Sequence, residues 1–375
     1  MGYPQFSVEY SGTLLDTNLT NSVVINSRDG LKTTVGVADF QIQNIDDDYT
    51  GKVKIDDSVD IYMGYATGSA CIFSGFVNEL SDQCDFKQRN MKVSCVNKME
   101  RLLSHLDSKD YPSGTGLSNQ TASAILGNII TRINGDIQND EPDITTTNVT
   151  TTIAVITPYA YNYRPVMEIL RELSAPEKTG NGQFIYYIDK SNDLHFKPRP
   201  VTSATTPTID EYNFTEFRAT YSIFDVINAV IVNCGTDDNG ASVLAMGVNF
   251  SSVTEVGFRW KYIVKNEIGD SYRNANLTNA EKRTKMRSDG ESWAESYTKL
   301  LGEPRWKVIA TMKGNYNYPG TTTQMITGEV VKMTSSSNWS GTKALRVMDI
   351  QQNFNFNGWM TGLKLEEDDK TKLII

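Results

Sequence analysis

Apolar and polar residues alternate in six short runs along the first hundred residues. The runs are SVEYSG, SVVINSRDG, TTVGVADFQIQN, SVDIYMGY, CIFSGFVNEL and NMKVSCVNK. Strict alternation over four to eight residues is typical of strands with one buried face, and short strands at regular spacing favour a small antiparallel barrel or sandwich. In the third run, a one-residue irregularity would turn four apolar residues inward, namely Val35, Val37, Phe40 and Ile42. In the sixth, Met91, Val93 and Cys95 should share one face.

The period changes to helical spacing after residue 97. Residues 98–106 predict a short helix with Met99, Leu102, Leu103 and Leu106 on one face, residues 121–133 predict a second and residues 165–175 a third. The Thr-rich residues 144–156 should form a strand, and residues 182–200 a hairpin that turns at 190–193. Residues 107–204 therefore read as a mixed α/β unit inserted after a first strand-rich domain at 1–106.

The remaining residues, 205–375, return to strand patterns around one long helix. Residues 226–235 predict a buried strand, and residues 279–303 predict an amphipathic helix that contains Gly290 and ends before Pro304. Four more strands are expected within 306–367. A second barrel would then use roughly residues 205–240 and 305–368, with an irregular insertion between them. The predicted fold class is α+β and β-rich.

Composition and charge narrow the functional classes. The chain has 375 residues and a formal net charge of −9, without a Lys/Arg stripe of the kind that grips nucleic acid. Neither a signal peptide nor a membrane span is expected. The cysteines at 71, 84, 95 and 234 form no C-x-x-C pair, so we expect small buried hydrophobes rather than a zinc or redox site.

The motifs of common enzymes are missing from the sequence. His105 and His195 lack an H-x-x-x-H partner, and the chain contains neither a G-x-S-x-G elbow nor a Walker loop. Structural roles are expected for both histidines. We therefore predict that the protein is not an enzyme, with no catalytic, cofactor-binding or metal-binding residue and no cofactor.

Three candidate sites keep alternatives open. Glu291 and Glu295 lie one turn apart on the long helix, which is compatible with a peptidoglycan hydrolase but far more typical of a solvated helix face. Residues 46–57 have an EF-hand-like spacing at Asp46, Asp48, Thr50, Gly51 and Asp57, although strand-like flanks and Asp at the last position favour a plain β-turn. The tyrosine-rich segments 157–165 and 315–320 suit either sugar or receptor binding or subunit packing.

Four segments, in their order along the chain, resemble the hub family of phage tails that includes late control protein D and the baseplate hubs of contractile-tailed phages. They are residues 37–65, in which Asp57–Tyr65 matches the "gD.V.Iy.Gy" strand, residues 72–104, residues 193–200 (DLHFKPRP) and residues 349–366. The Thr-rich middle segment and residues 235–278 depart from the family pattern.

This resemblance implies a specific architecture and role. Such hubs have two tail-tube-like β-barrels per subunit and form trimers, so that six barrels make a pseudo-sixfold ring. The ring would join a hexameric tail tube to a central spike, needle or fibre, with DNA passing through the lumen without specific binding. The implied location is the virion tail or baseplate, assembled in the host cytoplasm. A tail-associated hydrolase and a receptor- or carbohydrate-binding tail module are the alternatives.

Overall fold

The structure is a computed structural model, and it divides the chain into two compact units. Unit 1 comprises Met1–Arg218 and Val308–Glu366, and unit 2 comprises Ala219–Lys307 with the described part of Glu367–Ile374. The residues described are 4–15, 19–28, 35–44, 49–65, 68–84, 89–107, 110–111, 120–136, 143–153, 155–156, 159–160, 164–175, 179, 183–200, 203, 205–273, 275–314, 317–318, 325–355 and 358–368.

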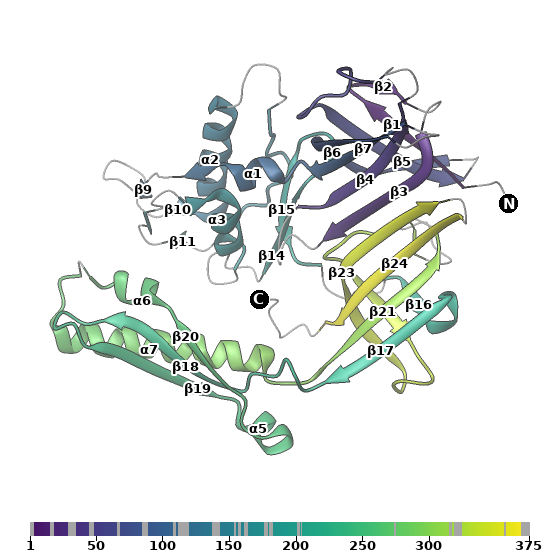
Figure 1. The fold of residues 1–375 in the computed structure, drawn as a ribbon. Coiled ribbons are helices and arrows are strands. Elements are labelled where there is room, and N and C mark those ends of the chain that lie inside the picture. The colour runs from purple at the N-terminus through teal and green to yellow at the C-terminus, as the bar shows by residue number, and fades with distance from the viewer. Residues whose placement is uncertain are drawn as a thin grey trace. The chain divides into compact units, whose positions relative to one another are not determined.

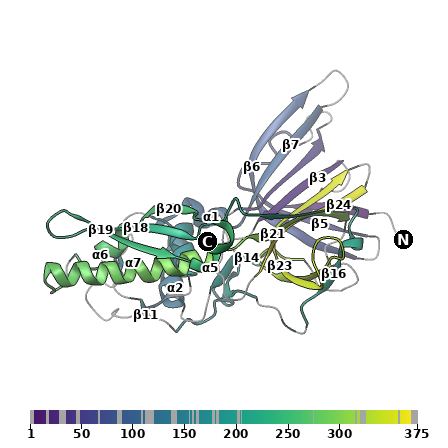
Figure 2. The same cartoon turned by 90° about the horizontal axis from the view of Figure 1, so that it is seen from below.

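Unit 1 begins with an antiparallel sheet built by the predicted alternating runs (Figure 1). Its strands are β1 (Pro4–Tyr10), β2 (Thr13–Leu14), β3 (Leu19–Arg28), β4 (Val37–Gln43), β5 (Ser58–Tyr65), β6 (Gly68–Cys84) and β7 (Arg89–Asn97). They lie in the order β3-β4-β7-β6-β5-β1-β2. Figure 2 shows β6 and β7 as a long hairpin.

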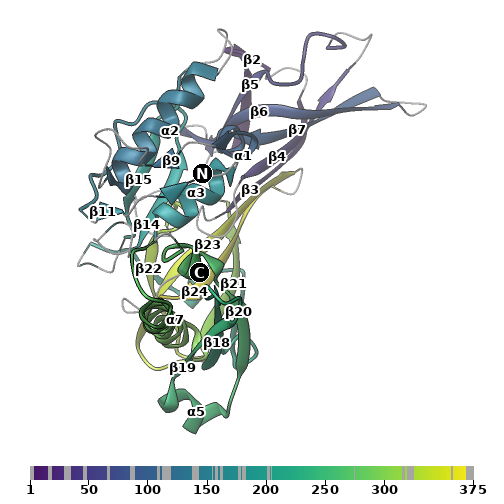
Figure 3. The same cartoon turned by 90° about the vertical axis from the view of Figure 1, so that its left-hand side faces the viewer.

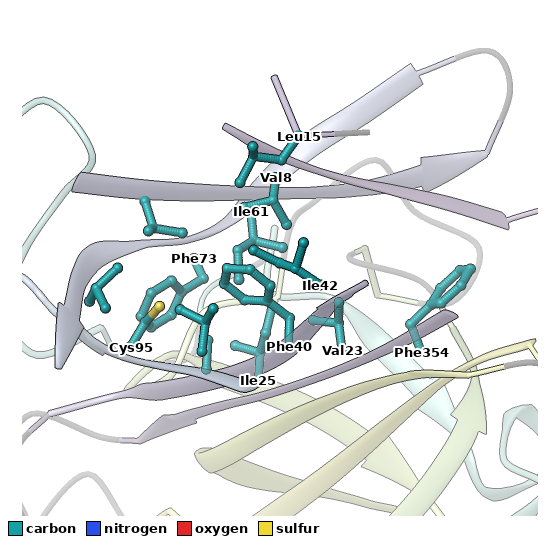
Figure 4. Close-up of a cluster of buried hydrophobic side chains, with 14 of the residues drawn as sticks. Val8, Leu15, Val23, Ile25, Phe40, Ile42, Ile61, Phe73, Cys95 and Phe354 are labelled. Atoms are coloured by element: carbon teal, nitrogen blue, oxygen red, sulfur yellow. The ribbon is translucent and has the colours of Figure 1, made fainter. Parts of the chain in front are cut away.

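One face of these strands forms the apolar core shown in Figure 4. Met91, Val93 and Cys95 are buried side by side on β7, as predicted. The prediction for β4 was wrong in its register. The β4–β7 pairing has no shift, so Ala38, Phe40 and Ile42 point inward while Val37 faces the other side. Because side chains alternate with a period of two, a bulge assumed where none exists moves a residue to the opposite face.

The second half of the sheet comes from the other end of the chain. Its strands are β16 (Thr208–Asp210), β17 (Glu216–Ser222), β21 (Arg305–Lys313), β22 (Val330–Thr334), β23 (Thr342–Asn355) and β24 (Gly358–Glu367), with a short 3-10 helix, η2 (Glu211–Asn213), after β16. They lie in the order β17-β21-β24-β23, with β22 and β16 following on the other side of β23. The β-rich fold class is confirmed.

Helices and short strand pairs fill the segment between the two halves. The elements are α1 (Glu100–Ser104), β8 (Leu106–Asp107), β9 (Asp110–Tyr111), β10 (Gln120–Thr121), α2 (Ala122–Asp136), β11 (Val155–Ile156), β12 (Tyr159–Ala160), β13 (Arg164–Pro165), α3 (Val166–Leu173), β14 (Phe184–Ile188) and β15 (Leu194–Pro198). The helices α2 and α3 and the β14–β15 hairpin agree with the sequence predictions.

Two predictions in this segment were wrong. Helix α1 ends at Ser104 because His105 is extended, so Leu103 and Leu106 are 44% and 60% exposed instead of buried beside Leu102. The Thr-rich segment is not a long strand, since Thr145 and Val149 make only isolated bridges to the β14–β15 hairpin. The Asp193 carboxylate of the hairpin accepts from the Thr145 hydroxyl and from the Thr147 backbone amide, so that this amide is not available to a strand ladder.

Unit 2 is a three-stranded sheet covered on one face by a long helix (Figure 3). It contains β18 (Ala229–Thr236), β19 (Ser242–Val248), α5 (Phe250–Val256), β20 (Trp260–Val264), α6 (Asn266–Asp270) and α7 (Asn279–Leu301). The predicted strand at 226–235 exists as β18. However, it pairs with β19 and β20 and does not belong to the larger sheet, because both partner strands lie in the segment that was predicted to be an irregular insertion.

The long helix α7 confirms the helix predicted at 279–303 and explains its glycine. Thr278 and Glu281 form a capping box at its start. Gly290 faces the sheet, where an added Cβ would lie 2.3 Å from Cys234 Sγ and 2.6 Å from Ala245 Cβ. Glycine therefore lets helix and sheet approach closely. Within the described residues, no helix combines the length and apolar character needed to cross a membrane.

We expect Gly290→Ala to destabilise the protein by about 1–3 kcal/mol, because overpacking against Cys234 outweighs the better helix propensity of alanine. The matched control is Gly127→Ala in α2, where an added Cβ meets nothing within 4 Å and should stabilise by about 0.5–1 kcal/mol. Guanidinium denaturation followed by circular dichroism measures both. Equal, stabilising effects at the two positions would contradict the packing argument.

Candidate functional site

The two halves of the unit 1 sheet are joined by one antiparallel strand pair, β3 with β23 (Figure 1). The register runs from Val23 opposite Phe354 to Arg28 opposite Asp349. The earlier residues of β23, Thr342–Arg346, pair with β22. One long strand thus belongs to the ladders of both halves, and we call the β3–β23 pair the seam.

Aromatic side chains add a second connection between the halves. Phe354 packs edge-on against Phe6 of β1, with ring centroids 4.8 Å apart. Tyr65, at the end of β5, donates a hydrogen bond to the Gly314 carbonyl at 2.7 Å, and its ring lies 5.7 Å from that of Trp359. Residues distant in sequence are therefore held together by both ring contacts and a hydrogen bond.

The Trp359 ring is buried at the edge of the apolar core, where its polar atom also finds a partner. Its indole nitrogen and the Thr361 hydroxyl both donate to Gln352 Oε1, at 2.6 and 2.7 Å. The Gly314 amide donates to the Trp359 carbonyl at 2.6 Å, and a Cβ on Gly314 would lie 1.9 Å from the indole. Only glycine fits there. The buried Gln352 side-chain oxygen accepts from both donors, which fixes the indole in one orientation.

The strand path has two ends, at β2 and at β17. Among the described strands, β17 pairs only with β21, and most of its side chains are exposed. An edge strand presents backbone N–H and C=O groups that can pair with another chain. The joined sheet therefore offers directional edges for assembly.

A polar cluster in the β14–β15 hairpin combines Asp189, Asp193 and His195, whose ligand atoms lie within 4.8 Å of one another. Asp193 accepts hydrogen bonds from the Thr145 hydroxyl, the Thr147 amide and the Asn148 side chain. Burial opposes its ionisation, but these hydrogen bonds prevail and lower the pKa of Asp193. The cluster thus attaches the Thr-rich segment to the hairpin.

The Asp189 carboxylate also accepts hydrogen bonds from neighbouring groups of the hairpin. One of its oxygens accepts from the Ser191 and Asp193 amides, and the other lies 3.0 Å from His195 Nε2. The His195 ring also stacks on Tyr187, with centroids 4.5 Å apart. Carboxylates and imidazole are metal ligands in principle. Here the oxygens already accept protein hydrogen bonds, so we interpret the cluster as structural.

The structure does not bring the other candidate residues together with these three. His105 places Nδ1 at 2.5 Å from the Arg101 carbonyl at the end of α1. Glu291 and Glu295 both lie on the exposed side of α7.

The structure describes the side chains of three of the four cysteines, all except Cys84, and these three are buried to different extents. Cys95 and Cys234 are buried and Cys71 is half-buried, all as free thiols. Burial raises the pKa of Cys95 to about 12 and, with the nearby Asp60 carboxylate, that of Cys71 to about 11. Their thiols therefore remain protonated at neutral pH, as expected of small hydrophobes.

The remaining candidate loops are described only in part. Asp46 and Asp48 lie outside the described residues, as do most of 157–165 and 315–320. Asp57 accepts hydrogen bonds from the Lys54 amide at 2.9 Å and from the Tyr10 hydroxyl, as a residue that closes a turn does. Tyr318 is fully buried.

Sequence reasoning missed the residues that hold the two halves together. Tyr65, Gly314, Gln352 and Trp359 lie in segments that were correctly read as strands or loops, yet their contacts join positions up to 249 residues apart. Gly314, at the end of a predicted strand, was the one local signal that another side chain approaches the backbone closely there.

Tyr65→Phe should keep the ring on Trp359 but remove the hydrogen bond to Gly314, at a cost of about 1 kcal/mol. We expect faster amide exchange in β24, measured by mass spectrometry. The matched control is Tyr62→Phe, because its hydroxyl bonds Glu9 within the first half of the sheet. If both variants exchange equally fast in β24, Tyr65 does not connect the halves.

Asp193→Asn should cost about 2 kcal/mol at pH 7, the contribution of hydrogen bonds to a charged acceptor. A carboxylate whose pKa is lower in the folded state stabilises the fold above its ordinary pKa, here 3.8, and this contribution disappears as the pH falls below it. The stability difference between wild type and variant should therefore shrink below about pH 4. The exposed Asp143→Asn serves as control; a difference independent of pH would contradict the ionised Asp193.

No protein-family model matches this chain, and neither does any curated protein. Solved structures do match. The 43 kDa tail protein of prophage MuSo2 from Shewanella oneidensis has a TM-score of 0.63 and 15% identity, covering 96% of this chain and 98% of that one. A tail protein from Neisseria meningitidis MC58 has a TM-score of 0.64 and 12% identity, covering 98% and 97%.

A third similar structure is the Escherichia coli c3393 protein, described as a type VI secretion component that resembles the T4 phage tail proteins gp27 and gp5. Its TM-score is 0.53 at 10% identity, covering 98% of this chain and 78% of that one. At such identities the likeness concerns the fold alone. The chain has the fold of prophage tail proteins along almost its entire length.

Proposed function

We propose that this chain is the structural hub of a phage tail or of a related phage-like particle, without catalytic activity. The observation that carries the proposal is the joined sheet of unit 1, in a fold shared with prophage tail proteins over 96–98% of the chain. Each half of this sheet contributes one tube-like barrel, so that one subunit supplies two. Three subunits then form a pseudo-sixfold ring.

Two similar modules in each of three chains would match the symmetry of both neighbours of the hub. A ring of three chains with two similar modules each presents six positions to a hexameric tail tube and three to a central spike, needle or fibre. Closing the ring also removes free strand edges such as β17, which would otherwise promote aggregation. The three-domain division at 1–106, 107–204 and 205–375 belongs to the same proposal.

The acidic charge suits a channel through which DNA passes. Three chains at −9 each carry −27. A lumen with net negative potential repels duplex phosphates, so exiting DNA does not adhere to the wall. In this proposal the protein works in the virion tail or baseplate, after assembly in the host cytoplasm.

The purified chain should form a particle of three copies of 41.9 kDa, with a threefold ring and six similar densities in end-on electron micrographs. Native mass spectrometry and particle imaging make the two measurements. Repeating the mass measurement at high salt is the control, because association through edges and apolar surface persists where purely ionic association weakens. A stable monomer, or a ring without threefold symmetry, is incompatible with the proposed hub.

A further inference from the structure

The sheet of unit 2 is apolar on both faces, but α7 covers only one of them. On the covered face, Val230, Val232 and Val243 pack with Met286 and Ala294 of the helix. The opposite face carries Leu244 and Met246 of β19, Ile231 of β18, and Trp260, Tyr262 and Val264 of β20. Together with Phe258, we call these residues the outer face.

Strand register makes the outer face continuous. Ile231 lies opposite Met246 on one side and Tyr262 on the other, and Asn233 lies likewise between Leu244 and Val264. Phe258 extends the surface by stacking on Trp260, with centroids 5.4 Å apart. The polar side chain at the centre of this face is Asn233. Its amide is hydrogen-bonded, because it donates to the Tyr262 hydroxyl at 3.0 Å.

The alternation along β20 confirms that its two faces differ in character. Lys261 points toward the helix side, where it donates to the Tyr297 hydroxyl at 3.0 Å. Trp260, Tyr262 and Val264 are 52–57% exposed. The charge on this strand is thus turned away from the outer face, whose seven members carry none.

We infer that the outer face is an interface between copies of this chain. Six of its side chains are 47–57% exposed, which leaves on the order of 600 Å² of apolar surface in contact with water. A stable protein interface covers roughly 800 Å² on each partner, so this face supplies most of one side.

Its composition also selects a copy of the same chain as the partner. Interfaces between identical subunits are apolar at their centre, rich in aromatic residues and Met, and poor in charge. Two chains that each carry −9 repel one another, and contact through an uncharged surface avoids placing like charges together. In a threefold ring each copy presents the outer face to its neighbour. The inference therefore rests on the proposed hub and names a surface that builds it.

The test compares two double variants in the full chain. Met246→Glu with Val264→Glu places charges at the centre of the outer face, and Ser288→Glu with Ser292→Glu adds the same charge to the exposed side of α7. Native mass spectrometry should show a multi-copy wild type and control. The outer-face variant should require a roughly 30-fold or higher concentration to associate.

A second measurement does not depend on whether the glutamate variants fold. A photoreactive benzoyl-phenylalanine in place of Phe258, which is 53% exposed and has no polar group to lose, should cross-link two copies. Cross-links within a single chain, or to a different tail protein only, would overturn the inference.

The two proposals fail in different ways. If the wild type forms a ring and the outer-face variant forms the same ring, while circular dichroism shows that the variant is folded, the proposed interface is wrong and the hub proposal stands. A wild-type chain that stays monomeric overturns both.

Discussion

The backbone pairing of β3 with β23 is the constraint on which the rest of unit 1 depends. It joins the two halves of the sheet through a pair of strands that lie more than 300 residues apart in sequence. Buried backbone donors and acceptors must find partners on folding. The two halves therefore form their neighbouring edges together, because separating them would expose six residue pairs of the ladder and the side chains stacked on it.

The side chains around the seam follow from this constraint. The Phe354 side chain of β23 packs in the core of the first half. The Tyr65 side chain of β5 donates to Gly314, the residue after β21. Gln352 lies two residue pairs from the end of the seam and accepts from Trp359 and Thr361, so a buried amide determines the position of the indole. Each contact alone is worth about 1 kcal/mol. Their common function is to fix one orientation between the halves.

The sequence predicted elements better than it predicted their partners. Periods of 2 and 3.6 located β5, β7, α2, α3 and α7, because those patterns report a single buried face. The β18 strand was found but assigned to the wrong sheet, since pairing is non-local and its partners lay in a segment without a strong pattern. The Thr-rich segment failed for another reason. Asp193, some 45 residues away, accepts from the Thr147 backbone amide, a donor that a strand ladder would use, and from the Thr145 and Asn148 side chains.

In the proposed hub, the two units contribute to assembly in complementary ways. The joined sheet ends in strand edges, whose hydrogen bonds are directional and determine the geometry of pairing but add little net free energy each. The outer face of unit 2 is apolar and uncharged, so it supplies affinity that scales with buried area and depends weakly on angle. A closed ring of acidic chains needs both: geometry to close at a fixed number of copies, and enough neutral contact area to overcome the repulsion between them.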